Sequence, residues 1–126
     1  MILAAYQFYR KVIEETYPEL LEQKRILHLD HPQRVTTLVQ GFDQGKAVQL
    51  YVPDLIDPSS TFNLWRARAD VLASSVNDAL ILADVLTTRL EPDSRNPKLS
   101  NRPRTECLAG PGYGVVRVQF EFLLKT

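Results

Sequence analysis

Cysteine is almost absent from the 126-residue chain, which has a single thiol at Cys107. One cysteine cannot form an internal disulfide, and it cannot supply a cysteine-rich metal site. No pattern around Cys107 indicates a nucleophile with a base beside it, and lone cysteines are mostly small, buried hydrophobic side chains. We therefore expect Cys107 to be buried and to have no catalytic role.

Long apolar runs are absent too. The apolar stretch at residues 79–83 is far below the roughly 18 residues that a membrane span requires. Residues 1–5 lead into aromatic and charged residues, and they have neither the basic start nor the length of a signal sequence. We expect a protein that is made in the cytoplasm and has no membrane partner.

An excess of either charge is lacking as well, because 15 basic residues balance 15 acidic ones. Such a chain has no overall positive field for non-specific nucleic-acid binding, although a local basic patch still permits it. With 44% hydrophobic and 24% charged residues, the composition is that of an ordinary globular protein, and the length suits one domain. We expect a single domain over residues 1–126.

The clearest pattern that is present is an alternation with period two over residues 114–125. It predicts a strand with one face in the core. The expected core face consists of Val116, Val118, Phe120, Phe122 and Leu124, and the other face carries Arg117, Gln119, Glu121 and Lys125. Because few strands are evident to cover the sheet edges, we expect an exposed edge here, where Arg117, Gln119 and Glu121 contact another subunit.

Helical spacing occurs in two places. Near the N-terminus, steps of three and four predict a helix that ends before Pro18, with a buried face of Leu3, Tyr6, Tyr9, Val12 and Ile13. Over residues 61–90 the same steps predict a long central helical segment, capped at its start by Ser59, Ser60 or Thr61. It packs on the sheet or, alternatively, forms a coiled coil, and Ser74 and Ser75 can divide it into two helices.

Two further segments resemble strands of a hairpin. Residues 34–40 and 46–52 are rich in β-formers and flank a glycine-bounded loop. A short strand is also expected at 25–30, and a connector at 53–60. The predicted fold is therefore α+β: a small, mostly antiparallel sheet packed by an N-terminal helix and a long central helical segment.

Residues 91–112 form a predicted long loop with four prolines. We expect residues 105–108 within it to pair back onto the last strand. Five cations lie in or beside this loop, and they suit contacts with a phosphate backbone or with acidic groups of another subunit. They are Arg89, Arg95, Lys98, Arg102 and Arg104.

Catalytic motifs are incomplete. His28, Asp30 and His31 are similar to half of the metal-binding signature of metallo-β-lactamase-fold hydrolases, but no third histidine exists to complete a ligand set. A strand end followed by a turn is the preferred interpretation, and a small metal-dependent hydrolase is the least favoured function. The glycine-rich residues 110–114 lack the Lys-Ser/Thr of a phosphate-binding loop and predict a turn. We expect no catalytic residue, cofactor or metal.

In its order of elements the chain resembles the tail-terminator and tail-completion proteins in the neck of long-tailed bacteriophages. The segments that carry the likeness are 34–52, 61–90 and 114–125, without a diagnostic motif. The resemblance implies a viral structural protein of the virion, assembled in the host cytoplasm. It implies a homo-oligomeric ring between tail and head, of a kind that is commonly hexameric in that group, which contacts tail tube, sheath or connector proteins and has DNA in its lumen. The alternative is a nucleic-acid-binding adaptor that acts through residues 89–104.

Overall fold

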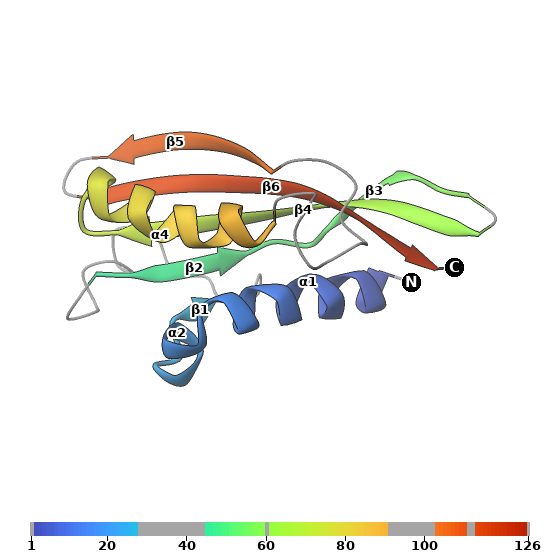
Figure 1. Ribbon diagram of the computed structural model, residues 1–126, viewed down its shortest axis with the longest axis horizontal. Helices are drawn as coiled ribbons and strands as arrows, with labels where there is room; N and C mark the ends of the chain where they lie inside the picture. Colours follow the sequence, from blue (N-terminus) through green and yellow to red (C-terminus); the bar gives the residue numbers. More distant parts are fainter. Residues whose placement is uncertain (1, 28–44, 60, 91–102, 111–112, 126) are drawn as a thin grey trace.

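Two helices lie on one face of a mixed, mostly antiparallel sheet in the computed structural model (Figure 1). The structure describes residues 2–27, 45–59, 61–90, 103–110 and 113–125. The helices are α1 (Ile2–Thr16), α2 (Pro18–Glu22) and α4 (Val76–Arg89). The strands are β1 (Ile26–Leu27), β2 (Ala47–Leu50), β3 (Asp54–Asp57), β4 (Phe62–Ala73), β5 (Arg104–Gly110) and β6 (Tyr113–Lys125). The predicted α+β class is confirmed.

The sheet order is β1-β2-β4-β6-β5, and β3 pairs with β4 outside that path. The pair β1–β2 is parallel and the other described pairs are antiparallel. Helices α1 and α4 share one core with the sheet, because Tyr9 of α1 contacts Phe120 of β6 and the Tyr17 hydroxyl donates to the Leu82 carbonyl oxygen at 2.6 Å. None of the described helices combines the length and apolar character needed to cross a bilayer.

The N-terminal helix ends as predicted. It stops at Thr16, and Pro18 then starts α2, where its missing N–H is not needed by the first turn. Tyr9, Val12 and Ile13 are buried as expected, whereas Leu3 is 63% exposed because the buried stripe begins only at Ala5.

The central segment differs most from the prediction. Residues 62–73 form strand β4, and only the second half of the predicted helical stretch is the helix α4. Every second residue of β4 from Asn63 to Ala73 is buried, so this stretch satisfies period two as well as helical spacing. The pairing with β6 along the whole of β4 favours the strand. The correct part of the prediction is the break, because Ser75 caps α4 by accepting from the Asp78 N–H at 3.1 Å.

Other predicted boundaries also change. The expected connector at 53–60 contains β3, and Ser59 accepts from the N–H groups of Thr61 and Phe62, so it caps a turn before a strand and not a helix. β2 pairs with β1 and β4, while the first arm of the predicted hairpin, 34–40, lies outside the described residues. The predicted pairing of 105–108 with the last strand is confirmed, so residues 104–110 of the expected loop are β5.

The last strand has its predicted core face but not its predicted position. Val116, Val118, Phe120 and Phe122 are buried, and Leu124 packs against them. However, β6 lies between β4 and β5 and pairs with both. The expectation that it is an edge strand is therefore wrong, and the outer edge on that side of the sheet belongs to β5.

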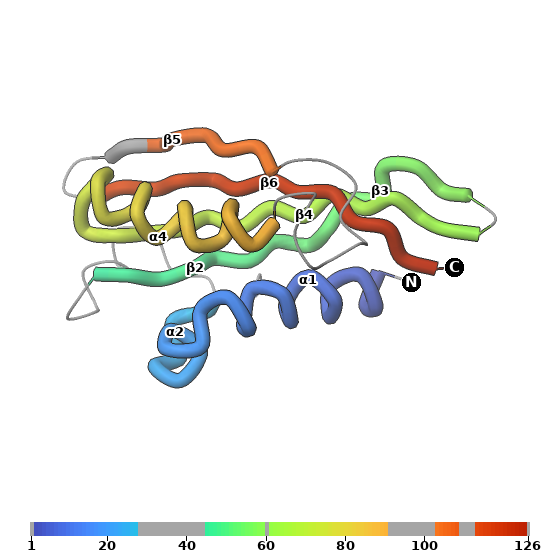
Figure 2. Tube along the Cα trace, viewed as in Figure 1, coloured from blue at the N-terminus to red at the C-terminus, as the bar shows by residue number. Residues whose placement is uncertain are grey.

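The far end of the sheet extends beyond both helices. Figures 1 and 2 show β3, the start of β4 and the end of β6 projecting past α1 and α4 as an arm. The geometry agrees, since the 14 residues of α4 span about 20 Å. The 12 residues of β4 span about 35 Å.

Candidate functional site: a polar network on the second sheet face

The sheet face opposite α1 and α4, called here the second face, carries most of the charged side chains of the sheet. The register of β4, β6 and β5 places these residues in adjacent rows on it. The charged residues are Arg66, Arg68 and Asp70 of β4, Arg117 and Glu121 of β6, and Arg104 and Glu106 of β5, and the uncharged Gln119 of β6 lies among them. Among the described residues, a small apolar cluster of Leu27, Ala47, Leu72 and Val115 is buried at one end of this face.

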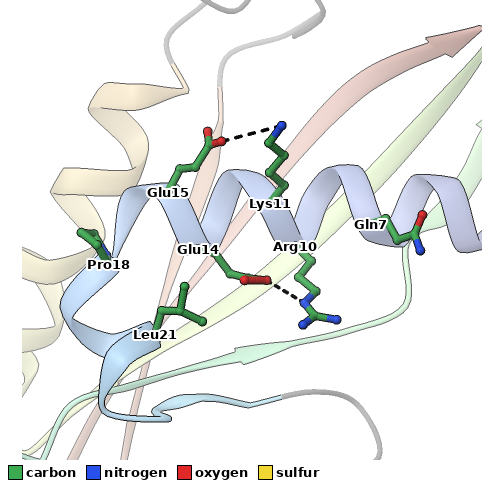
Figure 3. A pocket seen from close by; sticks show the side chains of 7 residues that line it. All are labelled: Gln7, Arg10, Lys11, Glu14, Glu15, Pro18 and Leu21. Atoms are coloured by element: carbon green, nitrogen blue, oxygen red, sulfur yellow. Dashed lines mark hydrogen bonds and ion pairs between the residues drawn. The ribbon is translucent and has the colours of Figure 1, made fainter.

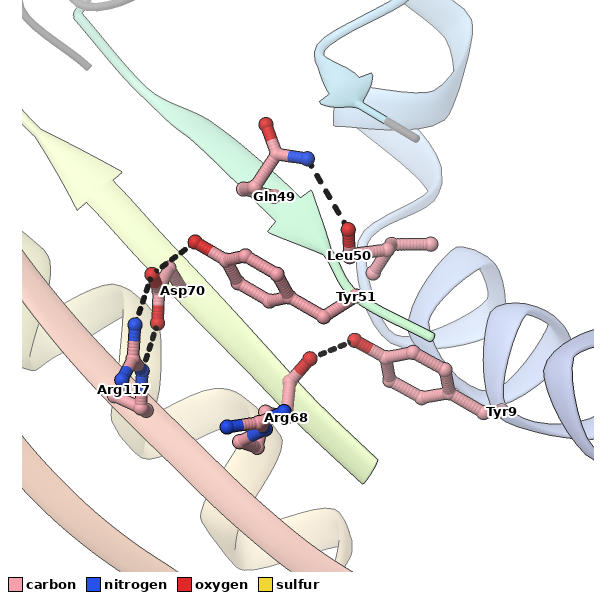
Figure 4. Close-up of polar contacts among 7 residues, drawn as sticks. All are labelled: Tyr9, Gln49, Leu50, Tyr51, Arg68, Asp70 and Arg117. Atoms are coloured by element: carbon pink, nitrogen blue, oxygen red, sulfur yellow. Dashed lines mark hydrogen bonds and ion pairs between the residues drawn. The ribbon is translucent and has the colours of Figure 1, made fainter. Parts of the chain in front are cut away.

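Asp70 is the centre of a polar network on the second face (Figure 4). It is 4% exposed, although it is charged. The Arg117 guanidinium donates from Nε to Oδ1 at 2.8 Å and from a terminal nitrogen to Oδ2 at 3.1 Å. The Tyr51 hydroxyl donates to the same Oδ2 at 2.6 Å. This fork geometry is the strong form of an arginine–carboxylate pair, and it satisfies a buried charge that would otherwise be very unfavourable.

Tyr51 also packs against the arginine, whose guanidinium carbon lies 5.6 Å from the ring centroid. Burial of the ring and the hydrogen bond to Asp70 raise the pKa of Tyr51 from 10.0 to about 12. The hydrogen bond to Asp70 raises the pKa of Arg117 as well. The network thus joins the end of β2 to β4 and β6, with the Tyr51 phenol and the Arg117 guanidinium protonated at neutral pH.

We expect the protein to lose stability as pH rises from about 10 to about 12. The folded state holds the Tyr51 proton more tightly than the unfolded chain, because the folded pKa is about 12 and the ordinary value is 10.0. The contribution of Tyr51 is therefore complete below the unfolded pKa and disappears as pH passes the folded pKa. Denaturant midpoints between pH 9 and 12, read with phenolate absorbance, measure this.

Tyr51→Phe is the matched control for that titration. Burial raises the pKa of Tyr9 and Tyr17 too, so some pH dependence will remain in the variant. The loss between pH 10 and 12 should nevertheless be smaller in Tyr51→Phe than in the natural protein. Equal slopes would contradict the role given to Tyr51.

The three hydrogen bonds to Asp70 come from within the protein, and both carboxylate oxygens take part in them. Because Asp70 is also almost fully buried, a substrate has little access to this carboxylate. Beside it lies a shallow hollow of about 240 Å³ that holds both charges, lined by Arg104, Thr105, Glu106, Arg117 and Gln119. What the arrangement does is hold three strands in register.

A second hollow, of about 520 Å³, lies on the outer surface of α1 and α2 (Figure 3). Its charged residues pair among themselves, since Arg10 lies 2.6 Å from Glu14 and Lys11 lies 4.0 Å from Glu15. Glu15 also binds Arg89 of α4 at 2.9 Å. The pairs link neighbouring turns and helices, and they leave no convergent set of polar groups for a ligand.

The five predicted loop cations are not brought together within the described residues. Arg89 ends α4 and is paired with Glu15, and Arg104 is exposed on β5. Arg95, Lys98 and Arg102 lie outside the described part of the chain. Of the three predicted contact residues of the last strand, Arg117 is held by Asp70, and Glu121 lies 3.7 Å from Arg66. Gln119 lines the hollow beside β5.

The residues of the candidate metal motif lie outside the part of the chain that the structure describes. His28, Asp30 and His31 belong to the undescribed segment 28–44. Within the described residues no group of three or more His, Cys, Asp or Glu side chains is placed to hold a metal. Cys107 is exposed on β5, which corrects the expected burial, because β5 is the outermost strand and α4 does not cover it.

The sequence interpretation missed Asp70 and Tyr51. Asp70 belongs to no catalytic or metal-binding motif in the sequence, and its partner Arg117 is 47 positions away in the chain. The one available signal was the position of this aspartate within residues 62–73. Once that stretch is known to be a strand with alternating buried positions, a carboxylate in it requires a charged or hydrogen-bonding partner. No known family model and no curated protein sequence matches this chain.

Proposed function

We propose that this chain is a structural assembly subunit that forms a homo-oligomeric ring, as a tail-terminator or neck protein between the tail and head of a long-tailed bacteriophage. The observation that carries the proposal is the outer edge of β5. Among the described residues, β5 pairs with β6 alone, and residues 104–107 are all exposed.

An open strand edge presents a row of backbone N–H and C=O groups that another chain can pair with. Natural sheets often end in a very short edge strand, whereas β5 is seven residues long, and it exposes Arg104, Glu106 and the thiol of Cys107. A neighbouring copy that adds a strand here extends the sheet and satisfies those groups. Repeated around an axis, a head-to-tail contact of this kind closes a ring.

A role without catalysis fits the same residues. The most chemically distinctive described side chains, Asp70, Arg117 and Tyr51, are bonded to one another in support of the sheet. In a ring of this type the neighbours would be tail tube, sheath or connector proteins, with DNA in the lumen and the virion as the location. For the alternative, a nucleic-acid-binding adaptor, the described cations Arg89 and Arg104 lie on different elements, so no specific observation favours it.

Light scattering measures whether the protein assembles, and the reactivity of the Cys107 thiol measures whether the edge of β5 is covered. We expect an oligomer at high micromolar concentration, and a clean monomer there would contradict the proposal. Because Cys107 is the single cysteine, a thiol reagent reports on β5 alone. Its rate should fall at least about tenfold between dilute monomer and assembled protein, since covering by a strand excludes the reagent. An unchanged rate would place the interface elsewhere than β5.

A further inference from the structure

Helix α4 is apolar on two sides. Its inner side, with Ala79, Ala83 and Leu86, is buried against the sheet. Its outer side carries Leu80, Ile81 and Val85, which are 47%, 59% and 49% exposed. Large apolar side chains that lie together, half exposed, on one helix face among polar residues such as Asp84 are typical of a surface that contacts another protein. These three outer residues, called here the helix patch, therefore indicate a surface that is covered in the assembled protein.

The arm carries a second apolar surface, on the second face. Phe62 of β4 is 45% exposed, and Leu64 and Leu123 beside it are partly exposed. Register makes these residues contiguous, because Phe62 lies opposite Lys125 and Leu64 lies opposite Leu123. Phe62, Leu64 and Leu123 are called here the arm patch. The arm extends past both helices, so the arm patch and the helix patch of one copy cannot meet (Figures 1 and 2).

The two patches have complementary charges. Lys125 is exposed at the end of the arm patch, and Asp84 is exposed within the helix patch, one turn after Leu80. Neither charge forms an ion pair with a described residue. An apolar patch with a cation therefore exists on one part of the molecule, and an apolar patch with an anion exists on another. Complementarity between two different surfaces of one chain produces head-to-tail contacts.

We propose that the arm patch of one copy packs on the helix patch of the next copy, with Lys125 paired to Asp84. The proposal rests on the assembly proposed above, and it adds a second contact between neighbouring copies to the pairing at the β5 edge. The occupant is a second copy of this chain. Because the arm patch lies on the second face and α4 lies on the opposite face, each copy offers one of each surface to its two neighbours.

The proposed contact can be tested with variants in which an aspartate is placed in one of the two patches. Phe62→Asp disables the arm patch and Ile81→Asp disables the helix patch, and both sites are exposed enough for the fold to tolerate the change. We expect each variant alone to form smaller assemblies than the natural protein by light scattering at the same concentration, because only the β5 edge is left to it. An equimolar mixture should form larger assemblies than either variant alone, because the intact arm patch of one variant can pack on the intact helix patch of the other.

Exchanging the charges of Asp84 and Lys125 tests the proposed ion pair separately. Asp84→Lys and Lys125→Glu should each weaken assembly at least about tenfold, because like charges then meet. The combined variant should recover assembly, since the pair is restored in reverse. Leu21→Asp is the matched control, as Leu21 is 44% exposed on α2 and belongs to neither patch; it should assemble normally.

The outcomes separate the two proposals. If the natural protein assembles and Phe62→Asp and Ile81→Asp assemble equally well, the arm–helix contact is wrong while the assembly function stands. If each single variant assembles less than the natural protein but their mixture assembles no better than either alone, the head-to-tail pairing of these two surfaces is wrong. A natural protein that stays monomeric overturns both proposals.

Discussion

Replacing Gly114 by alanine should lower the free energy of unfolding by about 3 kcal/mol or more. Gly114 lies in β6 where the N-terminus of α4 crosses the sheet, and there is no room for a side chain. A Cβ at this position would lie 2.5 Å from the Ser75 carbonyl oxygen, 2.5 Å from the Val76 Cα and 2.6 Å from the Val76 nitrogen. Because all three are backbone atoms, α4 itself must move away from the sheet. A thermal melt should show a decrease of about 10 °C or more.

Val76→Ala is the informative companion to Gly114→Ala. If the clash involved the Val76 side chain, truncating that side chain would relieve it. Because the nearest atoms belong to the backbone, the double variant should be at least as unstable as Gly114→Ala alone. Gly45 is the contrasting position, where the nearest atom to an added Cβ is the Ser74 Cβ at 2.9 Å. A melting temperature for Gly114→Ala within about 2 °C of the natural protein would contradict the close approach.

Asp70→Ala should cost about 3 kcal/mol, because it leaves the Arg117 guanidinium and the Tyr51 hydroxyl without their shared acceptor. The Arg117 side chain is 29% exposed, so water compensates in part and keeps the cost near the lower end for a buried pair. Urea denaturation with an unchanged m-value measures the effect as a stability change.

The pair Arg66–Glu121 is the matched control for Asp70–Arg117. It joins the same two strands in direct register, but its atoms are 3.7 Å apart and the two side chains are 40% and 20% exposed. Glu121→Ala should therefore cost only about 0.5 kcal/mol. Exchanging both members of the buried pair, with Asp70→Leu and Arg117→Met, should cost less than Asp70→Leu alone, because no charge is left unpaired. Equal losses in free energy of unfolding for Asp70→Ala and Glu121→Ala would contradict the larger contribution given to the buried pair.

Much of the fold followed from local pattern, and the exceptions share one cause. The stretch 62–73 has apolar residues at spacings that suit both a helix and a strand, so no local measure separates the two. β6 pairs along its whole length and decides for the strand. The same pairing places Arg117 beside Asp70. The wrong helix prediction for 62–73 and the missed Asp70 network therefore have the same cause.

The proposed contact surfaces were harder to predict from the sequence than the fold. The helical spacing of three and four includes the buried Ala79 and Ala83 and leaves out Leu80, Ile81 and Val85. Only the packed structure shows that these three side chains are about half exposed on the outer side of α4. Cys107 was expected to be buried because most lone cysteines are, and its exposure follows from the position of β5 as the outermost strand.

The sequence by itself determined the core face of the last strand, the end of the first helix before Pro18, the break at Ser75 and the hairpin of β5 with β6. Each of these depends on alternation, a missing N–H, a cap or a short turn, and all of these causes act within a few residues. The tertiary structure alone decided that 62–73 is a strand, that the last strand is internal, and that Asp70 meets an arginine 47 positions away. Those outcomes depend on which distant segments pair, and the free energy of that pairing is a property of the whole sheet.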